Sequence, residues 1–213
     1  MDIRDEIINR SERLFLRLGV RSVSMDDISS QLGISKKTLY QHFENKDALV
    51  EAVISTHSER KQCTIEQLCG RAKDALDEIR QIGAFITASI EDASPSALYD
   101  LQKYYRKSWE LLTDKRDERV AVCIRRNIER GIAEGLYRSD LQPEIIAKLY
   151  ARLTQAIIEL MADVSAAKFS RQQMIWELHN YHIHGIANVK GLKQWEQYSS
   201  EMKFYEGKNF ERV

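Results

Sequence analysis

Proline and glycine, the two residues that most often interrupt regular structure, are scarce in this chain. Its 213 residues include two prolines and nine glycines, while 43% of the residues are hydrophobic. Because the strands of β proteins are usually separated by turns rich in these two residues, the shortage favours an all-α fold. The length is sufficient for one large or two small domains with a hydrophobic core.

An excess of positive charge and a long hydrophobic run are also absent. Lys and Arg together number 32, and so do Asp and Glu, so the whole chain has no basic character that would favour nucleic acid. No segment approaches eighteen consecutive apolar residues, and Asp2 and Arg4 place charges near the N-terminus. These features predict a cytoplasmic protein without a membrane partner.

The three cysteines do not form a recognisable ligand or disulfide pattern. Cys63, Cys69 and Cys123 include no C-x-x-C pair. Structural zinc and a disulfide framework are therefore not expected, and the interpretation we favour is that the cysteines are buried thiols.

Signatures of catalysis and of cofactor binding are missing as well. The sequence has no Gly-rich phosphate loop, no nucleophile elbow and no paired carboxylates, which argues against an enzyme and against a cofactor. His179 and His182 are three residues apart and could share a helix face with a metal ion, but only Glu177 stands near them as a further ligand. The favoured alternative is a polar strip that includes His184, so no metal site is predicted.

Capping residues divide the beginning of the chain into short helices. Apolar spacing predicts a first helix over 2–18, followed by Gly19 at the position where a left-handed residue ends a helix. Ser24 and Asp27 have the spacing of a capping box at the start of a second helix. The remaining expected caps are Gly33 at the end of that helix, Ser35 before a third helix and Asn45 before a fourth that reaches about residue 68.

The second and third helices form a helix-turn-helix, and the third has a polar outer face that the fold does not require. Leu39 and Phe43 are four residues apart and face the core. The charges of Lys36 and Lys37 lie in the first turn, where the helix dipole disfavours cations. A polyanion bound at this end would stabilise them. Lys46, in the first turn of the fourth helix, would reach a phosphate. The polar side chains expected on the outer face of the third helix and its flanks are Lys36, Lys37, Thr38, Tyr40, Gln41 and His42.

This pattern predicts a recognition helix that enters the major groove of DNA. The alternative is an ordinary solvated helix face, since lysine and threonine are common on surfaces.

Four segments resemble, in their order and spacing, the DNA-binding domain of TetR-family transcriptional regulators. They are FLRLG from Phe15, SMDDI from Ser24, LGISKKTLYQHF from Leu32 and NKDAL from Asn45. The resemblance covers about residues 3–54. It implies an all-α homodimer with about nine helices or more per subunit, and control of a nearby operon that a small ligand relieves.

The resemblance also implies a division into domains and a set of DNA contacts. Residues 1–50 would form the helix-turn-helix domain, and 51–213 a larger C-terminal helical bundle for ligand binding and dimerisation. Lys37 stands where the family often has a small residue, so it would be specific to this protein's operator. The implied contacts are Lys36, Lys37 and Thr38 in the major groove and Ser24, Tyr40, His42 and Lys46 on phosphates.

Two of these positions need comment. His42 is either a phosphate contact, as the resemblance implies, or an ordinary surface residue. Asp26 stands where some family members have a basic contact, and we assign it to the start of the second helix instead.

Apolar spacing predicts five helices in the rest of the chain up to residue 190, and an amphipathic helix in the aromatic tail from Lys193. Ser94 with Pro95, and Ser170 with Gln173, are expected to start two of them. The five are expected at 72–90, 95–112, 120–132, 143–165 and 171–190.

The helices near 143–165 and 171–190 are the candidates for a homodimer interface. They contain the small residues Ala151, Ala156 and Gly185, which permit close approach of helices. The alternative is that both are ordinary core helices. A twofold dimer would place two recognition helices about 34–36 Å apart, one turn of DNA.

A pocket for a small, mostly apolar effector is expected among the helices of 70–165. Aromatic side chains with polar tips suit such a ligand, although the same residues at helical spacing also form ordinary cores. The candidate residues are Phe85, Tyr104, Tyr105, Trp109, Met161 and Trp176.

The sequence thus favours a repressor that binds a palindromic operator as a dimer and is released by a small ligand. The alternative is a constitutive DNA-binding factor of the same fold without a ligand. The operator, the regulated genes and the choice between repression and activation stay open.

Overall fold

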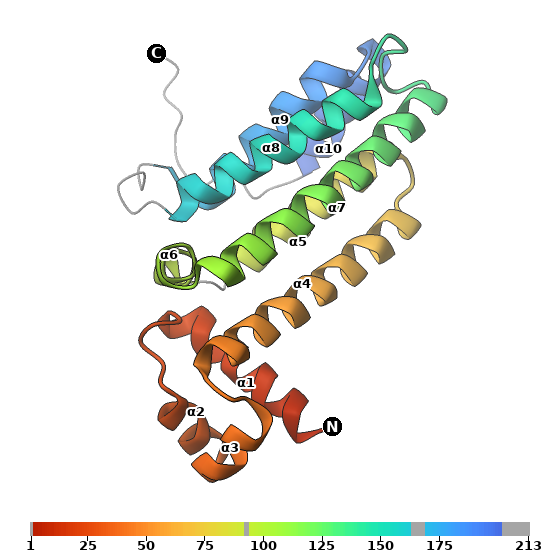
Figure 1. Cartoon of the computed structure of the whole chain (residues 1–213). Helices are drawn as coiled ribbons and strands as arrows, with labels where there is room; N and C mark the ends of the chain where they lie inside the picture. The colour runs from red at the N-terminus through yellow and green to blue at the C-terminus, as the bar shows by residue number, and fades with distance from the viewer. Residues whose placement is uncertain (1, 92–93, 163–168, 202–213) are drawn as a thin grey trace.

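The described part of the chain is built from helices alone. The computed structural model describes residues 2–91, 94–162 and 169–201, and these contain ten α-helices and no strand (Figure 1). The expected all-α fold, with a helix-turn-helix domain and a larger helical bundle, is confirmed. None of the described helices has both the length and the apolar character needed to cross a membrane.

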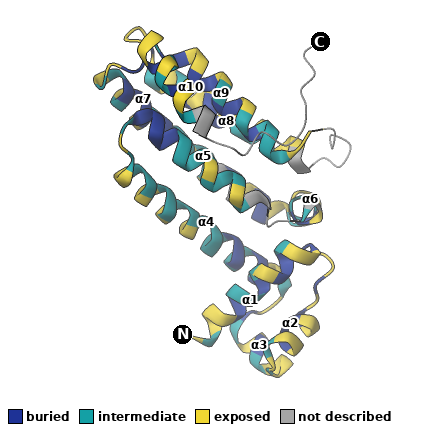
Figure 2. Ribbon diagram, turned by 180° about the vertical axis from the view of Figure 1, so that it is seen from behind, coloured by how far each residue is buried: buried dark blue, intermediate teal, exposed yellow. Residues whose placement is uncertain are grey.

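Four helices enclose the N-terminal core. They are α1 (Ile3–Leu18), α2 (Met25–Leu32), α3 (Lys36–His42) and the beginning of α4 (Lys46–Arg71). Burial in α4 is confined to its first turns, while the rest of the helix is half-buried or exposed (Figure 2). The fully buried residues at the centre of this core are Ile7, Val23, Ile28, Leu39, Leu49 and Val50.

Six helices make up the C-terminal bundle. A long α7 packs along α8, and α5 packs on α9 and α10. Ile79, Ile128, Ile183 and Trp195 are among the side chains at the centre of this core. The six are α5 (Ala75–Glu91), α6 (Pro95–Tyr104), α7 (Arg106–Ala133), α8 (Pro143–Ala162), α9 (Arg171–Ile186) and α10 (Val189–Glu201).

The helices predicted at 95–112 and 120–132 were wrong in their boundaries. The backbone breaks at Tyr105, which has φ −124° and ψ 54°, and α7 then continues without interruption to Ala133. The apolar spacing of Leu101, Tyr105 and Trp109 runs through the break and conceals it. The charged stretch between Leu112 and Val120 interrupts the apolar spacing, but it contains neither proline nor glycine to end a helix.

The helix predicted at 171–190 was also too long. It ends at Ile186, because Ala187 is extended (φ −74°, ψ 148°), and α10 begins at Val189. The amphipathic helix expected in the tail is confirmed up to Glu201, with Trp195 buried in the bundle core. The aromatic residues beyond Glu201 lie outside the described residues.

The cysteines are less buried than expected. Cys63 is exposed, and Cys69 and Cys123 are half-buried, so the interpretation as buried thiols was wrong. Apolar spacing does not predict how deeply these cysteines are buried, because α4 and α7, which carry them, bury only part of their surfaces where they meet.

Candidate nucleic-acid interface

Side-chain caps fix the helices that carry the polar face. Ser24 and Asp27 form a reciprocal capping box at the start of α2, and Gly33 ends this helix in the left-handed conformation at φ 64° and ψ 25°. Ser35 Oγ accepts a hydrogen bond from Thr38 N at 3.0 Å, and Asn45 Oδ1 accepts one from Ala48 N at 2.9 Å. These predicted caps are confirmed, and they set the turn angles between α2, α3 and α4.

The helix α3 buries one side and exposes the other. Leu39 is fully buried and Phe43 nearly so, at 0% and 3% exposure. Lys36 and Lys37 are exposed, and Tyr40 is an exposed aromatic side chain at 49%. Thr38 and His42 are half-buried, and Gln41, which the predicted contact set omits, is exposed. The helix therefore presents lysine, hydroxyl and amide groups at the outer end of the molecule (Figure 1).

Lys36 is paired with an acidic neighbour. Its Nζ atom lies 2.6 Å from Asp26 Oδ2, and both side chains are more than half exposed, at 62% and 58%. An exposed ion pair of this kind contributes only about 0–1 kcal/mol. A phosphate can therefore replace Asp26 as the partner of Lys36 at little cost in free energy.

The hydroxyl groups of Ser24 and Thr38 already have partners inside the module. Ser24 Oγ donates to Asp27 Oδ2 at 2.6 Å and accepts from Asp27 N at 3.1 Å. Hydrogen bonds from Ser24 lower the pKa of the Asp27 carboxyl group. Thr38 Oγ1 lies 2.8 Å from Ser35 Oγ. Ser24 thus has its hydroxyl hydrogen committed to the cap.

Lys46 points toward the C-terminal bundle. Its Nζ atom donates to the carbonyl oxygen of Arg21 at 3.3 Å and lies 5.8 Å from the centre of the Tyr105 ring. Burial lowers the pKa of Lys46, although Asp100 opposes the shift. The side chain therefore lies at the junction between the two cores.

The same junction contains residues that the sequence did not single out. Asp100 on α6 is buried, and its Oδ2 atom accepts a hydrogen bond from Arg21 N at 2.8 Å. The guanidinium of Arg21 lies over the Tyr104 ring, 4.7 Å from its centre, and donates to its hydroxyl at 3.0 Å. Gly19 has φ 85°, positive as expected, and a Cβ there would lie 2.8 Å from Asp100 Oδ2.

Comparison with known proteins identifies the family. A sequence model of the family described as "Bacterial regulatory proteins, tetR family" matches residues 7–53. The regulator TtgR of Pseudomonas putida is 33% identical over 156 residues, which span 69% of this chain and 72% of TtgR. The chain belongs to the TetR family. It is thus a DNA-binding transcriptional regulator and not an enzyme.

Other relatives of this TetR-family chain are more distant or match a shorter region. The transcriptional repressor KstR2 of Rhodococcus jostii is 27% identical over 157 residues, which span 67% of this chain and 71% of the repressor. The regulator YvaF of Bacillus subtilis is 31% identical over 119 residues, 55% of this chain and 62% of that protein. This last match spans less than two thirds of the relative.

Solved structures agree with the fold. A transcriptional regulator from Cytophaga hutchinsonii aligns with a TM-score of 0.67 at 19% identity and covers 86% of this chain and 98% of its own. At this level of identity the likeness concerns the TetR fold alone.

The residues predicted to line an effector pocket lie in different surroundings. Tyr105 packs against the N-terminal core, and Tyr104 is 44% exposed beside Arg21. Trp176 stacks on Trp195 with ring centres 5.9 Å apart. The remaining positions are Phe85, half-buried on α5, Trp109, buried on α7, and Met161, whose side chain lies outside the described residues.

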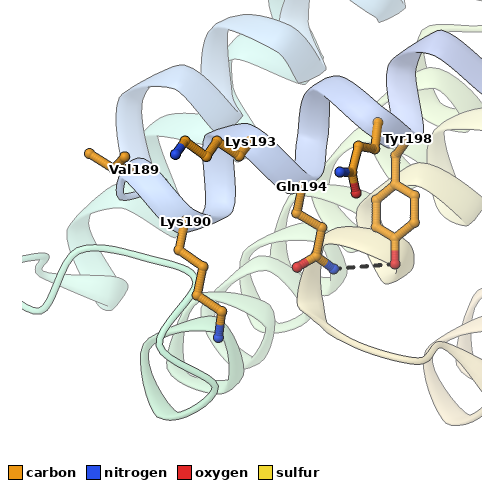
Figure 3. A pocket seen from close by; sticks show the side chains of 6 residues that line it. Val189, Lys190, Lys193, Gln194 and Tyr198 are labelled. Atoms are coloured by element: carbon orange, nitrogen blue, oxygen red, sulfur yellow. Dashed lines mark hydrogen bonds between the residues drawn. The ribbon is translucent and has the colours of Figure 1, made fainter.

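A surface hollow of about 670 Å³ lies along α10, and none of those residues lines it (Figure 3). Gln194 donates hydrogen bonds across its edge to Asp74 Oδ2 at 2.7 Å and to the Tyr198 hydroxyl at 3.3 Å. The residues that line it are Val189, Lys190, Lys193, Gln194, Gln197 and Tyr198.

Two histidines of α9 are buried, so the expected polar strip was wrong for them. His179 and His182 are 8% and 6% exposed, and His184 alone is exposed. His182 lies against Tyr150, with ring centres 4.4 Å apart. Within the described residues its Nε2 atom has no hydrogen-bond partner. Burial lowers the pKa of His182 to about 3, with a further contribution from His179.

Proposed function

We propose that this protein is a homodimeric repressor that binds a palindromic operator through α3 and is released by a small, mostly apolar ligand. Family membership supports regulation through DNA, and the relative KstR2 is named as a repressor. The observation that carries the proposal is an apolar stripe on α8 that the fold leaves uncovered. A palindromic operator requires two copies of the chain, and this stripe is a surface on which a second copy would pack.

The stripe follows the spacing of a single helix face. Ile145, Leu149 and Leu153 are 58%, 60% and 43% exposed, and Leu160 continues the row at 50%. The opposite face of α8 is packed in the bundle core through Ala147, Tyr150 and Ala151. Large exposed apolar side chains in one row mark a protein interface more often than a free surface.

The neighbouring helix α9 extends this apolar surface. Tyr181 is 73% exposed on α9, and the small residues Gly185 on α9 and Ala156 on α8 are exposed as well, which permits close approach of a partner helix. Ala151 is buried and so serves the core instead of the interface. We infer that the dimer forms through α8 and α9, as the isologous pairing of four helices.

The DNA contacts are proposed at the outer end of α3. Lys37, Thr38 and Lys36 would face the major groove, while Tyr40 and His42 would contact phosphates; Ser24 would do so only by exchanging its bond to Asp27. Phosphate and sugar contacts make up half or more of protein–DNA hydrogen bonds, and they fix the position of the protein without reading the sequence.

Lys46 is directed toward Arg21 and Tyr105, which supports a role at the domain junction in addition to its proposed phosphate contact.

The ligand is proposed to bind inside the C-terminal bundle, between α5, α7, α8 and α9. Phe85 and Trp109 would provide apolar contacts, and the Nε2 atom of His182, which has no hydrogen-bond partner within the described residues, supports a polar contact from α9. The imidazole is neutral at physiological pH because burial lowers the pKa of His182, so it would accept or donate a single hydrogen bond.

The experiment that tests the proposal is fluorescence anisotropy with DNA from upstream of the protein's own gene. We expect saturable binding at one dimer per inverted repeat, and at least about 1000-fold weaker binding to a scrambled duplex of equal length at the same salt concentration. Equal affinity for both duplexes would contradict operator recognition, whereas many scattered sites with no ligand effect would favour the constitutive alternative. A panel of apolar metabolites, screened by thermal shift, should include compounds that also lower DNA affinity.

A further inference from the structure

Two thiols and a carboxylate from three different helices meet near the far end of α4. Cys69 lies on α4, Glu78 on the first turn of α5 and Cys123 on α7. One ligand atom from each, the two sulfurs and a carboxylate oxygen, all lie within 4.8 Å of one another. The residues of the cluster are up to 54 positions apart in the sequence, so no short sequence motif predicts it.

The geometry is close to that of a thiophilic metal site. Zinc binds cysteine sulfur at about 2.3 Å and carboxylate oxygen at about 2.0–2.2 Å, so tetrahedral ligands are separated by roughly 3.4–3.8 Å. Side-chain shifts of about an ångström would bring three atoms within 4.8 Å of one another to that spacing. A water molecule would complete four-coordination, because Cys69 and Cys123 are only half-buried.

The charges around the cluster suit a divalent cation. Glu78 is 5% exposed, and Arg130 donates to its Oε2 atom at 2.9 Å. Arg130 is fixed in turn by Glu134 Oε1 at 2.7 Å and the Ala72 carbonyl at 3.0 Å. Two thiolates and a carboxylate around a divalent ion leave one negative charge, and the nearby guanidinium of Arg130, shared with Glu134, reduces its electrostatic cost. Such a partner also orients the carboxylate ligand.

A metal ion would bind the thiolate forms of Cys69 and Cys123, so its binding would release both thiol protons. Its affinity should therefore rise with pH.

We propose that Cys69, Cys123 and Glu78 bind one soft divalent cation of the zinc class per chain. The ion would link the end of α4 to α5 and α7, and α4 begins inside the DNA-binding module. The expectation that the chain has no metal site, drawn from the absence of C-x-x-C, is thereby revised. The proposal concerns metal binding itself and does not depend on the operator or the effector.

Cobalt(II) is a suitable probe, because coordination by thiolate gives it charge-transfer absorption that other ligands do not. We would titrate the reduced, full-length protein with Co²⁺ under anaerobic conditions after removing the reductant. The expected result is an absorption band that saturates at one Co²⁺ per chain and disappears when Zn²⁺ is added.

Variants separate the cluster from adventitious binding. Cys69→Ser and Cys123→Ser should each weaken Co²⁺ binding by more than the ~10–100-fold that loss of a group supporting a ligand costs. Glu78→Gln should weaken binding while leaving thiolate absorption at high Co²⁺. Cys63→Ser is the matched control, since Cys63 is exposed on the same helix, and it should bind Co²⁺ as the wild type does.

The proposal is overturned if the wild type shows no thiolate band, or if the band survives in both Cys69→Ser and Cys123→Ser. It is also overturned if Cys63→Ser loses the band to the same degree. Circular dichroism of each variant establishes that the helices are intact.

Discussion

Lys37 and Tyr40 differ in what they would do on DNA, although both are exposed on α3. Lys37 stands in the first turn of α3, where it would meet base edges, while Tyr40 lies three residues later on the exposed surface, where it would contact a phosphate. Base contacts discriminate between sequences, whereas phosphate contacts contribute equally to all of them. The two residues therefore allow the proposed interface to be examined in two independent ways.

Lys37→Ala should lower affinity for the operator by about 1–3 kcal/mol and relax the preference at one base-pair position. Tyr40→Phe is the comparison, because it removes a single hydroxyl and should weaken binding to specific and random DNA alike. Anisotropy titrations on an operator and on its single-base variants provide the measurement. Equal losses on specific and random DNA for Lys37→Ala would refute its assignment to the bases.

The buried His182 makes stability depend on pH. Burial lowers the pKa of His182 to about 3, so its stability contribution is present above the unfolded pKa of about 6.5 and is lost as the pH falls from there. We expect the free energy of unfolding to drop by about 2 kcal/mol between pH 7 and pH 5 from this group.

Urea denaturation at several pH values measures this drop. His182→Phe, which fills the site with a ring that cannot titrate, should remove most of it. His184→Gln is the control, since His184 is exposed on the same helix. An unchanged pH dependence in His182→Phe would show that another group is responsible.

At the scale of single residues, the sequence was informative where the signal is local. The caps Ser24, Ser35 and Asn45 follow from the pairing of one side chain with a backbone N–H three positions away. The partners of Lys46 and of Asp100 are set by packing between distant segments, so no local pattern could reveal them. The same holds for Cys69 and Cys123, which meet only because α4 and α7 are neighbours.

At the scale of helices, hydrophobic spacing predicted how many elements there are better than where they end. Leu101, Tyr105 and Trp109 keep a regular spacing across a backbone break, because Tyr105 turns to the N-terminal core and Trp109 is buried in the next helix. The sequence therefore indicated one continuous helix where two meet. A break without proline or glycine is produced by tertiary packing, which a one-dimensional pattern does not contain.

The uncovered face of α8 gives a prediction about assembly. Leu149→Glu should raise the dissociation constant of the dimer by on the order of 100-fold, because each dimer would then bury two carboxylates without partners. Leu149 is 60% exposed in the single chain, so the fold of the monomer should be unaffected. Sedimentation velocity over a range of concentrations measures the change.

Lys37→Glu serves as the control for this variant, since it also introduces a carboxylate but lies on α3, at the other end of the molecule (Figure 1). If Leu149→Glu dimerises as tightly as Lys37→Glu, then α8 is not part of the interface.

At the scale of the whole molecule, α6 connects the two cores. Asp100 accepts a hydrogen bond from Arg21 N in the α1–α2 loop, and Ser94 N, at the N-cap of α6, donates to the Leu16 carbonyl of α1 at 2.7 Å. Leu101 and Tyr105 add apolar contacts to the N-terminal core. The DNA-binding module is thus attached to the bundle by α6 as well as by α4.

Asp100→Ala should destabilise this attachment by about 1–3 kcal/mol, because the N–H of Arg21 loses its buried acceptor. Asp100→Asn keeps an oxygen in the same place and should cost less. Differential scanning calorimetry measures both, and we expect Asp100→Ala to lower the melting temperature of the N-terminal helices first. Equal losses in the two variants would mean that charge and not the hydrogen bond matters.

The length of α4 also sets a mechanical tolerance. Its 26 residues span about 39 Å, so a tilt of about 5° around its far end displaces its first turn by roughly 3 Å. That displacement is close to the ~3.4 Å rise between successive base pairs. In a dimer the tilt of α4 in each subunit would displace its recognition helix. A tilt too small to disturb the packing of α4 is therefore enough to shift the two recognition helices away from the spacing of the major grooves.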